Sequence, residues 1–314
     1  MKKILVCLGI LFLGLIISGC NIIEDDVNQT KVVNVIMPTG TPSLALATYV
    51  EEATANKTAN VEIVAGSDPL LAAFSSKSHD VIVAPVNLGA KMYQTYGDYI
   101  LYKAFVWGNL YLASKKSLNS IEELNGKTVV VFGKNSTPDI VFKAILKNYP
   151  ELNVNIEYAQ DVSEANTMLV SNQAEIIVSA EPSLSKLKSK LNLSVIDLQQ
   201  VWAEMTGSAS YPQAGIFVKK SEVNKKYIKD ALAVMKDAIE SAILDPNQTA
   251  AAAVNIHASF ASLGTETLAA SIPNCHYQLL ASDQAAVNYY LQMMIDLGFG
   301  KQMGEVLPDD EFFY

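Results

Sequence analysis

The sequence predicts an α/β protein of two lobes, each a mostly parallel sheet flanked by helices, with a cleft between the lobes. Strand and helix patterns alternate along most of the 314 residues, which is typical of parallel sheets with crossover helices. A strand, a small-residue loop and a Thr-Pro helix start occur twice, in "VIMPTGTPSLALA" and in "VVVFGKNSTPDIVF". The repetition indicates two similar series in tandem, one for each lobe.

The elements follow in order from hydrophobic spacing, caps and turn residues. The first series predicts strands at 33–37, 61–65 and 80–84, helices at 42–55, 69–75 and 87–93, and an extended stretch at 99–113. The second predicts strands at 128–132, 154–158, 175–179 and 193–197, and helices at 138–148, 162–171 and 182–191. A strand at 215–218 and a helical tail at 221–300 complete the chain. We therefore expect lobe 1 at 31–114 plus 214–314, and lobe 2 at 115–213.

The N-terminal segment has the pattern of a secretory signal peptide. Two lysines precede an apolar run from Ile4 to Ile17, which is too short and wrongly flanked for a membrane span. The ending Ile17-Ser18-Gly19-Cys20 resembles a bacterial lipobox, so we expect cleavage after residue 19, lipidation of Cys20 and a tether at 20–30. The alternative is an ordinary signal peptide with an incidental cysteine. The expected location is the outer face of a bacterial cytoplasmic membrane, anchored by lipid.

The charge composition limits the possible partners. The formal net charge is −9, from 32 acidic and 23 basic residues, which argues against nucleic acid and against a polybasic membrane patch. Every basic residue is a lysine. A bidentate guanidinium clamp is therefore impossible, and any anion must be held by lysines, hydroxyls and backbone N–H groups.

The sequence lacks the common catalytic and metal-binding motifs. The sequence has no GxSxG or HExxH motif, and "GKNST" lacks the spacing of a phosphate-binding P-loop. The adjacent Cys275 and His276 do not by themselves give metal-ligand geometry. A lipidated Cys20 would leave no partner for an internal disulfide. We therefore predict no catalytic residue, no metal, no cofactor and no enzymatic activity.

Polar residues just beyond the predicted strands are the candidate ligand-binding groups, because ligands of open α/β sheets bind beyond the carboxyl ends of the strands. Helix N-termini at the same edge present free N–H groups to anions. The candidates are Thr39, Gly40, Thr41, Ser67, Asn87, Trp107, Asn109, Lys134, Asn135, Ser136, Thr137, Glu181, Tyr211 and Gln213.

Each candidate also has a purely structural interpretation. Thr41 and Asn87 could simply cap helices, as Asp68 is expected to do. Lys134 could be a solvated loop lysine, and Trp107 could belong to the core.

Tyr211, Gln213 and Glu181 are equally ambiguous. Tyr211 and Gln213 lie where the chain is expected to return from the second lobe to the first, at the second crossing. Tyr211 and Gln213 could pack a hinge without touching ligand. Glu181, at a strand end before a proline, could meet a cationic or amide ligand.

Five segments carry a resemblance to a known family. They are "VNVIMPTGTPSLALA", "HDVIVAPVNLGAKMY", "SIEELNGKTVVVFGKNSTPDIVFKAIL", "MLVSNQAEIIVSAEPSLSKL" and "YPQAGIFVKKSEVNKKYIKD". In this order and spacing, they resemble the solute-binding lipoproteins of bacterial ABC importers, which have the type II periplasmic-binding-protein fold. Within that group the chain is similar to the nitrate/sulfonate/taurine and thiamine-pyrimidine binding branch. The resemblance covers most of residues 31–295.

The resemblance implies a monomeric protein that closes on one small organic molecule and delivers it to an ABC permease with its ATPase, without catalysis. Sulfonate or pyrimidine specificity does not carry over, because the chain has no arginine and no clear aromatic cage. Two alternatives stay open. One is a surface-anchored enzyme of pyrimidine or thiamine metabolism on the same fold, and the other is a non-transport lipoprotein with a degenerate cleft.

Overall fold

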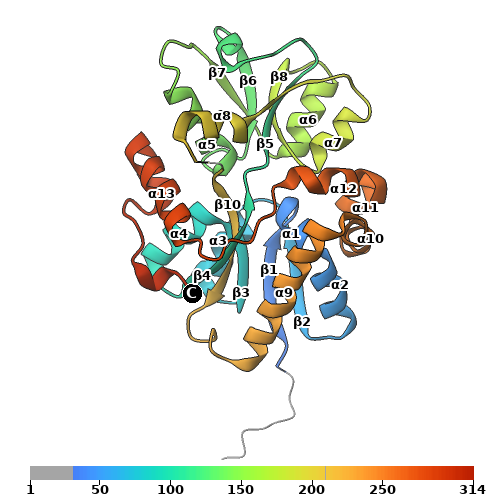
Figure 1. The fold of residues 1–314 in the computed structure, drawn as a ribbon, viewed down its shortest axis with the longest axis vertical. Helices are drawn as coiled ribbons and strands as arrows, with labels where there is room; N and C mark the ends of the chain where they lie inside the picture. Colours follow the sequence, from blue (N-terminus) through green and yellow to red (C-terminus); the bar gives the residue numbers. More distant parts are fainter. Residues whose placement is uncertain (1–30, 209) are drawn as a thin grey trace, which may run out of the picture. The chain divides into compact units, whose positions relative to one another are not determined.

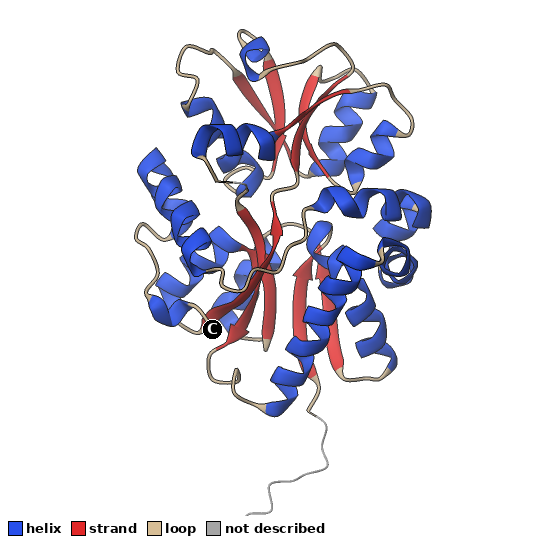
Figure 2. Cartoon of the chain, in the orientation of Figure 1, coloured by secondary structure: helices blue, strands red, loops and turns tan. Residues whose placement is uncertain are grey.

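Two five-stranded sheets form the centres of two lobes (Figures 1 and 2). The structure is a computed structural model that describes residues 31–208 and 210–314. The predictions for the signal peptide, Cys20 and the tether lie outside the described residues. Among the described residues, no helix is both long and apolar enough to cross a membrane.

The first lobe contains the sheet of order β2-β1-β3-β10-β4. Its strands are β1 (Val33–Pro38), β2 (Ala59–Val64), β3 (Val81–Pro85), β4 (Tyr99–Trp107) and β10 (Pro212–Lys219). Its helices are α1 (Thr41–Ala45), α2 (Ala47–Ala55), α3 (Asp68–Ser76), α4 (Val86–Tyr96), α9 (Lys226–Leu244), α10 (Pro246–Ile256), α11 (Ala258–Leu263), α12 (Thr265–Ser271), α13 (Gln284–Met294) and α14 (Gly300–Met303). Shorter turns are η2 (Ile272–Cys275), η3 (Ile295–Phe299) and η4 (Asp310–Phe312).

The second lobe contains the sheet of order β7-β6-β8-β5-β9. Its strands are β5 (Leu110–Ser114), β6 (Thr128–Phe132), β7 (Asn155–Ala159), β8 (Ile176–Ala180) and β9 (Ser194–Asp197). Its helical segments are η1 (Ile121–Leu124), α5 (Thr137–Lys147), α6 (Val162–Val170), α7 (Ser183–Lys188) and α8 (Leu198–Thr206).

The two sheets have the same plan, which confirms the predicted fold class. In each sheet one strand runs antiparallel to both neighbours, while the other four share one direction. The reversed strands are β10 and β5, which are also the strands that carry the chain from one lobe into the other. The repeated Thr-Pro motif thus begins α1 in the first lobe and α5 in the second, at equivalent places after β1 and β6.

Both faces of each sheet are covered by helices, which explains the continuous apolar runs in the strands. In β6, Val129 and Val131 pack toward α5 and α8, whereas Val130 packs toward α6 and α7. One hydrophobic cluster is shared by the two lobes and runs through Trp107 and Leu110 on either side of the first crossing. This shared core holds Lys31–Tyr314 together as one compact unit.

The first crossing corrects two predictions. The stretch 99–113 is not one extended segment, because Gly108 and Asn109 have φ angles of +101° and +97° and separate β4 from β5. A Cβ at residue 108 would lie 2.2 Å from Gln199 Cγ, so only glycine fits there. The strand β5 pairs with β8 and β9. The strand β5 therefore belongs to the second lobe, whereas the predicted boundary at residue 114 placed it in the first.

Two helix predictions also differ from the structure. The helix expected at 42–55 is divided at Leu46 into α1 and α2. The helix α8 was not predicted, although Asp197 provides a clear cap by accepting hydrogen bonds from the N–H groups of Gln199 and Gln200.

Candidate functional site

Each of the two Thr-Pro loops contacts the opposite lobe, and neither threonine hydroxyl caps its own helix. The N-cap residues are Gly40 and Ser136, neither of which makes a side-chain cap bond to its helix, so the structural interpretation of Thr41 as a cap is wrong. The Thr41 hydroxyl donates to the Glu181 carbonyl at 2.8 Å, and the Thr137 hydroxyl donates to Asn87 Oδ1 at 3.0 Å. In each loop, the threonine hydroxyl therefore donates a hydrogen bond to the opposite lobe.

The first of these contacts belongs to a buried group at the crossing, which we call the crossing cluster: Thr41, Asn109 and Glu181. Asn109 Oδ1 accepts from the Glu181 N–H at 2.8 Å, and Asn109 Nδ2 donates to the Glu181 carbonyl at 3.3 Å and to the Thr41 hydroxyl. All three residues are at most 3% exposed. The crossing residue thus ties the first-lobe loop to the second-lobe strand end.

The Glu181 carboxyl is oriented toward its own lobe. It accepts hydrogen bonds from the Ser185 N–H and hydroxyl, both at 2.9 Å. Burial raises the pKa of this carboxyl, and the two hydrogen bonds from Ser185 partly offset the effect. The expected ligand contact by the Glu181 side chain is therefore not what the structure shows, because its oxygens are occupied at the start of α7.

A second contact between the lobes joins β5 to the segment after α12. Tyr111 donates its hydroxyl proton to the Asn274 carbonyl at 2.9 Å, and its oxygen lies 3.1 Å from His276 Nε2. Because the phenol proton is committed to Asn274, His276 must donate from Nε2. Burial lowers the pKa of His276, and the nearby Asp197 opposes this shift.

The His276 contact gives an expected dependence of stability on pH. A histidine whose pKa is lowered by folding stabilises the fold above its ordinary value of 6.5, and that contribution is lost as pH falls through this value. We expect His276→Gln to lose this dependence of stability on pH. Melting temperatures of wild type and variant should differ by a constant amount above about pH 7.5, and the difference should shift in favour of the variant between about pH 6.5 and 5. Parallel curves over this range would contradict the expectation.

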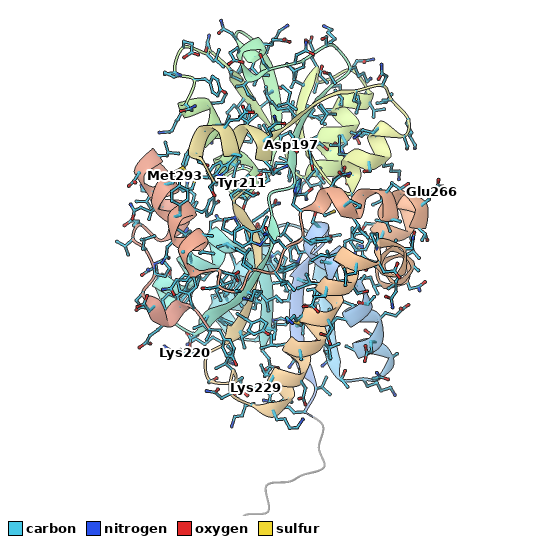
Figure 3. The ribbon with its side chains drawn as sticks, viewed as in Figure 1. Asp197, Tyr211, Lys220, Lys229, Glu266 and Met293 are labelled. Carbon is cyan, nitrogen blue, oxygen red and sulfur yellow. The ribbon has the colours of Figure 1, made fainter. Side chains whose placement is uncertain are left out.

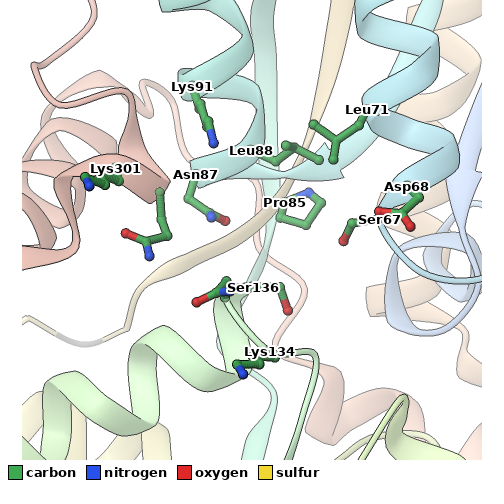
Figure 4. A pocket seen from close by; sticks show the side chains of 12 residues that line it. Ser67, Asp68, Leu71, Pro85, Asn87, Leu88, Lys91, Lys134, Ser136 and Lys301 are labelled. Atoms are coloured by element: carbon green, nitrogen blue, oxygen red, sulfur yellow. The ribbon is translucent and has the colours of Figure 1, made fainter.

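A cavity of about 360 Å³ lies between the lobes beside the second Thr-Pro loop (Figure 4). We call it the cleft cavity. From the first lobe it is lined by Ser67, Asp68, Leu71, Pro85, Asn87, Leu88, Lys91, Lys301 and Gln302, and from the second by Lys134, Asn135 and Ser136. Both lobes thus contribute side chains to one cavity, which is partly open to solvent.

The cleft cavity has an excess of positive charge. Three lysines line it, Lys91, Lys134 and Lys301, against one carboxylate, Asp68. Two helices of opposite lobes, α3 and α5, begin at its wall with N-cap serines that make no side-chain cap bond. Helix N-termini and ammonium groups both favour anions. Leu71, Pro85 and Leu88 add an apolar surface to the same space.

The Lys134 side chain is not simply solvated. Its ammonium lies 5.0 Å from the ring centroid of Tyr158, a cation–π distance, while the residue also lines the cavity. Asn135 has a left-handed backbone (φ +63°), and its N–H donates to Asp139 at 2.8 Å. The tight turn at residues 133–136 thus places Lys134 at the cavity wall.

The predicted candidates separate into three groups. Those that line the cleft cavity are Ser67, Asn87, Lys134, Asn135 and Ser136. Thr137 contacts this group through Asn87, whereas Thr41 and Asn109 belong to the crossing cluster with Glu181. Asp68, expected as a cap, is instead the first residue of α3 and lines the cavity.

The remaining candidates serve the scaffold. Thr39 donates its hydroxyl to the Val64 carbonyl, and Gly40 accepts the hydrogen bond that starts α1. Trp107 is buried and donates Nε1 to the Gln278 carbonyl, so the core interpretation of this residue holds. Tyr211 is buried and donates to Gln199, and Gln213 on the same strand does not line the cleft cavity. These contacts fit the interpretation that Tyr211 and Gln213 pack the second crossing without touching a ligand.

Sequence reasoning missed Lys91, Lys301 and Gln302. Lys91 carried a usable signal, because it lies four residues after Asn87 and so on the same face of α4. Lys301 and Gln302 carried none, because α14 reaches the site only through packing against α4. Among the described residues, no three His, Cys, Asp or Glu side chains are grouped closely enough to hold a metal ion.

The two sheets and the cavity between them define a class of fold, the two-lobed α/β fold that is also found in solute-binding proteins. The sequence model described as menaquinone biosynthesis matches residues 80–296, which is more than half of the chain. The chain belongs to this menaquinone biosynthesis family. No curated protein sequence matches it significantly.

Several solved structures share the fold. An ABC transporter protein from Parabacteroides distasonis is 23% identical, with a TM-score of 0.73, over 90% of this chain and 98% of that one. The alkanesulfonate-binding protein SsuA from Xanthomonas axonopodis pv. citri, bound to MOPS, is 10% identical with a TM-score of 0.64, over 90% and 97%. A ligand-binding component of an ABC-type import system from Staphylococcus aureus is 14% identical with a TM-score of 0.65, over 90% and 96%.

These findings correct two predictions. The assignment to the nitrate/sulfonate/taurine and thiamine-pyrimidine binding branch is wrong, because the family match is to menaquinone biosynthesis. The prediction of no enzymatic activity is wrong as well, because a biosynthetic family points to an enzyme. The sequence segments that suggested the solute-binding branch form the scaffold that both classes share, so they do not separate the two.

Proposed function

We propose that this protein is an enzyme of menaquinone biosynthesis that encloses a small organic anion between its lobes. The observation that carries the proposal is the cleft cavity, which is lined by lysines from both lobes and by apolar side chains. Its volume of about 360 Å³ is within the usual range for small-molecule sites. The family match supplies the biosynthetic context.

The lining indicates the chemical class of the molecule. Three ammonium groups against one carboxylate favour a ligand with two negative charges, and Leu71, Pro85 and Leu88 suit a carbon ring or skeleton. Without arginine, recognition rests on single ammonium contacts and N–H groups. Asp68 and the three lysines are the titratable side chains that line the cavity, so proton transfer to an enclosed ligand would use these groups.

A charge series on one ring tests the binding part of the proposal. We expect benzyl alcohol, benzoate and isophthalate to bind in increasing order, because each added carboxylate gains a lysine partner. Each step should strengthen binding roughly tenfold at low salt, and the differences should shrink as salt is added. Calorimetric titration of the full-length chain in mild detergent provides the affinities. Equal affinities across the series would contradict an anion site.

Turnover tests the enzymatic part. The full-length chain is incubated with the carboxylated intermediates of menaquinone biosynthesis, one at a time, and the mixtures are analysed by mass spectrometry. We expect one intermediate to be converted to a product of changed mass, at a rate that falls in a variant lacking Lys134. If one intermediate binds and is recovered unchanged, the enzymatic proposal fails and a receptor role is supported.

A receptor for import is the second candidate, and the N-terminal sequence favours it. A signal peptide that ends in Ile17-Ser18-Gly19, directly before Cys20, would place the protein on the outer face of the cytoplasmic membrane, anchored by lipid at Cys20. There a monomer could deliver its ligand to an ABC permease and its ATPase. Mass spectrometry of the protein from membranes checks the anchor, since lipidation adds the mass of the acyl chains at Cys20.

A further inference from the structure

We propose that Thr137 is a positioning residue that orients the Asn87 side-chain amide toward the ligand only when the two lobes are closed. The inference rests on the proposed function for the identity of the ligand, but not for the contact itself. Thr137 comes from the second lobe and Asn87 from the first, so their hydrogen bond joins the two lobes and would break if the lobes moved apart.

The contact is well protected. The Thr137 hydroxyl lies 3.0 Å from Asn87 Oδ1, and the two residues are 2% and 5% exposed. Thr137 does not itself line the cleft cavity, whereas Asn87 does (Figure 4). The threonine therefore acts on the cavity through the asparagine.

The direction of the hydrogen bond decides what Asn87 can offer. A free amide can turn either its oxygen or its nitrogen toward a ligand. When the Thr137 hydroxyl donates to Oδ1, the amide oxygen is engaged and the NH₂ group remains as the available donor. In the closed form, the Asn87 side chain therefore presents only its NH₂ donor to the cavity. This favours an anion and disfavours a ligand that can only donate hydrogen bonds.

The first Thr-Pro loop, which contains Thr41, has a different role. Thr41 bonds to Asn109 and to the Glu181 carbonyl, all in the crossing cluster, where the chain itself connects the lobes. That contact lies at the pivot, whereas the Thr137 contact lies beside the cavity. Two loops with the same sequence pattern therefore have separate roles, one at the pivot and one at the ligand.

The first test needs no ligand. In full-length protein labelled with ¹⁵N-asparagine, the Asn87 side-chain amide signals are assigned by their absence in Asn87→Ala. We expect Thr137→Val to speed hydrogen exchange of these amide protons roughly tenfold, since the net worth of one hydrogen bond is about a factor of ten. Thr137→Ser, which keeps the hydroxyl, should restore slow exchange. Unchanged exchange in Thr137→Val would overturn the proposal.

The second test uses isophthalate as the probe. We expect Thr137→Val to weaken its binding roughly tenfold, mainly through faster dissociation, and Thr137→Ser to bind as wild type does. In an Asn87→Ala background, Thr137→Val should cause no further loss, because Thr137 acts through Asn87. Additive losses would overturn the positioning role. If isophthalate does not bind to wild type, the anion proposal fails, while the exchange experiment still decides the role of Thr137.

A matched control separates the role from simple packing. Thr249 in α10 is fully buried, and its hydroxyl has no hydrogen-bond partner among the described residues. Thr249→Val makes the same chemical change far along the chain from the cavity lining. It should leave both the Asn87 exchange rate and isophthalate binding unchanged, and an equal effect of both substitutions would assign the result to general loosening of the fold.

Discussion

Replacing Asn109 by alanine is expected to lower the free energy of unfolding by about 3 kcal/mol, measured by urea denaturation. The substitution removes both hydrogen bonds to the Glu181 backbone and the bond to Thr41, all of them buried. The Glu181 N–H would then have no partner, at a cost of about 1–3 kcal/mol. Alanine would also have to adopt the φ of +97° that this position requires.

Two further variants divide that effect into its parts. Asn109→Gly loses the same hydrogen bonds but accepts the positive φ, so it should be less destabilising than Asn109→Ala by about 1 kcal/mol. Thr41→Val, which removes one hydroxyl of the crossing cluster, should cost about 1 kcal/mol. A loss below about 0.5 kcal/mol in Asn109→Ala would show that the crossing cluster does not hold the lobes together.

Neutralising two lysines of the cleft cavity is expected to have the largest effect on binding. In Lys134→Met with Lys301→Met, isophthalate affinity should fall about a hundredfold at low salt, since each lost charge-assisted contact costs about a factor of ten. The two lysines come from different lobes, and methionine preserves much of the apolar stem. Titration calorimetry at low and high salt measures the loss.

The matched control is Lys229→Met. Lys229 is exposed on α9 and lies far from the cleft in Figure 3, while the overall charge changes in the same direction. It should reduce affinity by less than about twofold, because a distant exposed charge is screened by salt. Equal losses in the control and in single cavity variants would attribute the effect to net charge and remove the cleft cavity from the mechanism.

The local patterns of the chain were sufficient for most of the scaffold. The strand β6 has the predicted bounds, and the strands β1 and β3 lie within one or two residues of theirs, because short β-branched runs between turn residues leave few alternatives. Loop residues beyond these strands, among them Lys134 and Asn87, line the cleft cavity, and their contact with a ligand stays a prediction. The topology of parallel strands places such residues together whatever their chemistry.

The roles of those residues could not be read locally. The same Thr-Pro pattern is compatible with helix capping and with contact to the other lobe. Only the position of the opposite lobe shows that the Thr41 and Thr137 hydroxyls bond to that lobe. The division of 99–113 into β4 and β5 was similarly hidden, because both strands are apolar and the break depends on two backbone angles at Gly108 and Asn109.

The sequence by itself determined the two tandem βα series, the absence of arginine and the acidic surface, since these depend on residue type and short-range spacing alone. Only the tertiary structure decided which lysines line one cavity, because Lys91, Lys134 and Lys301 are far apart in the chain and are brought to it by the packing of α4, the turn at residues 133–136 and α14. The same convergence decided that Thr137 contacts Asn87 across the cleft. Periodicity reports which face of an element is buried, but not which element buries it.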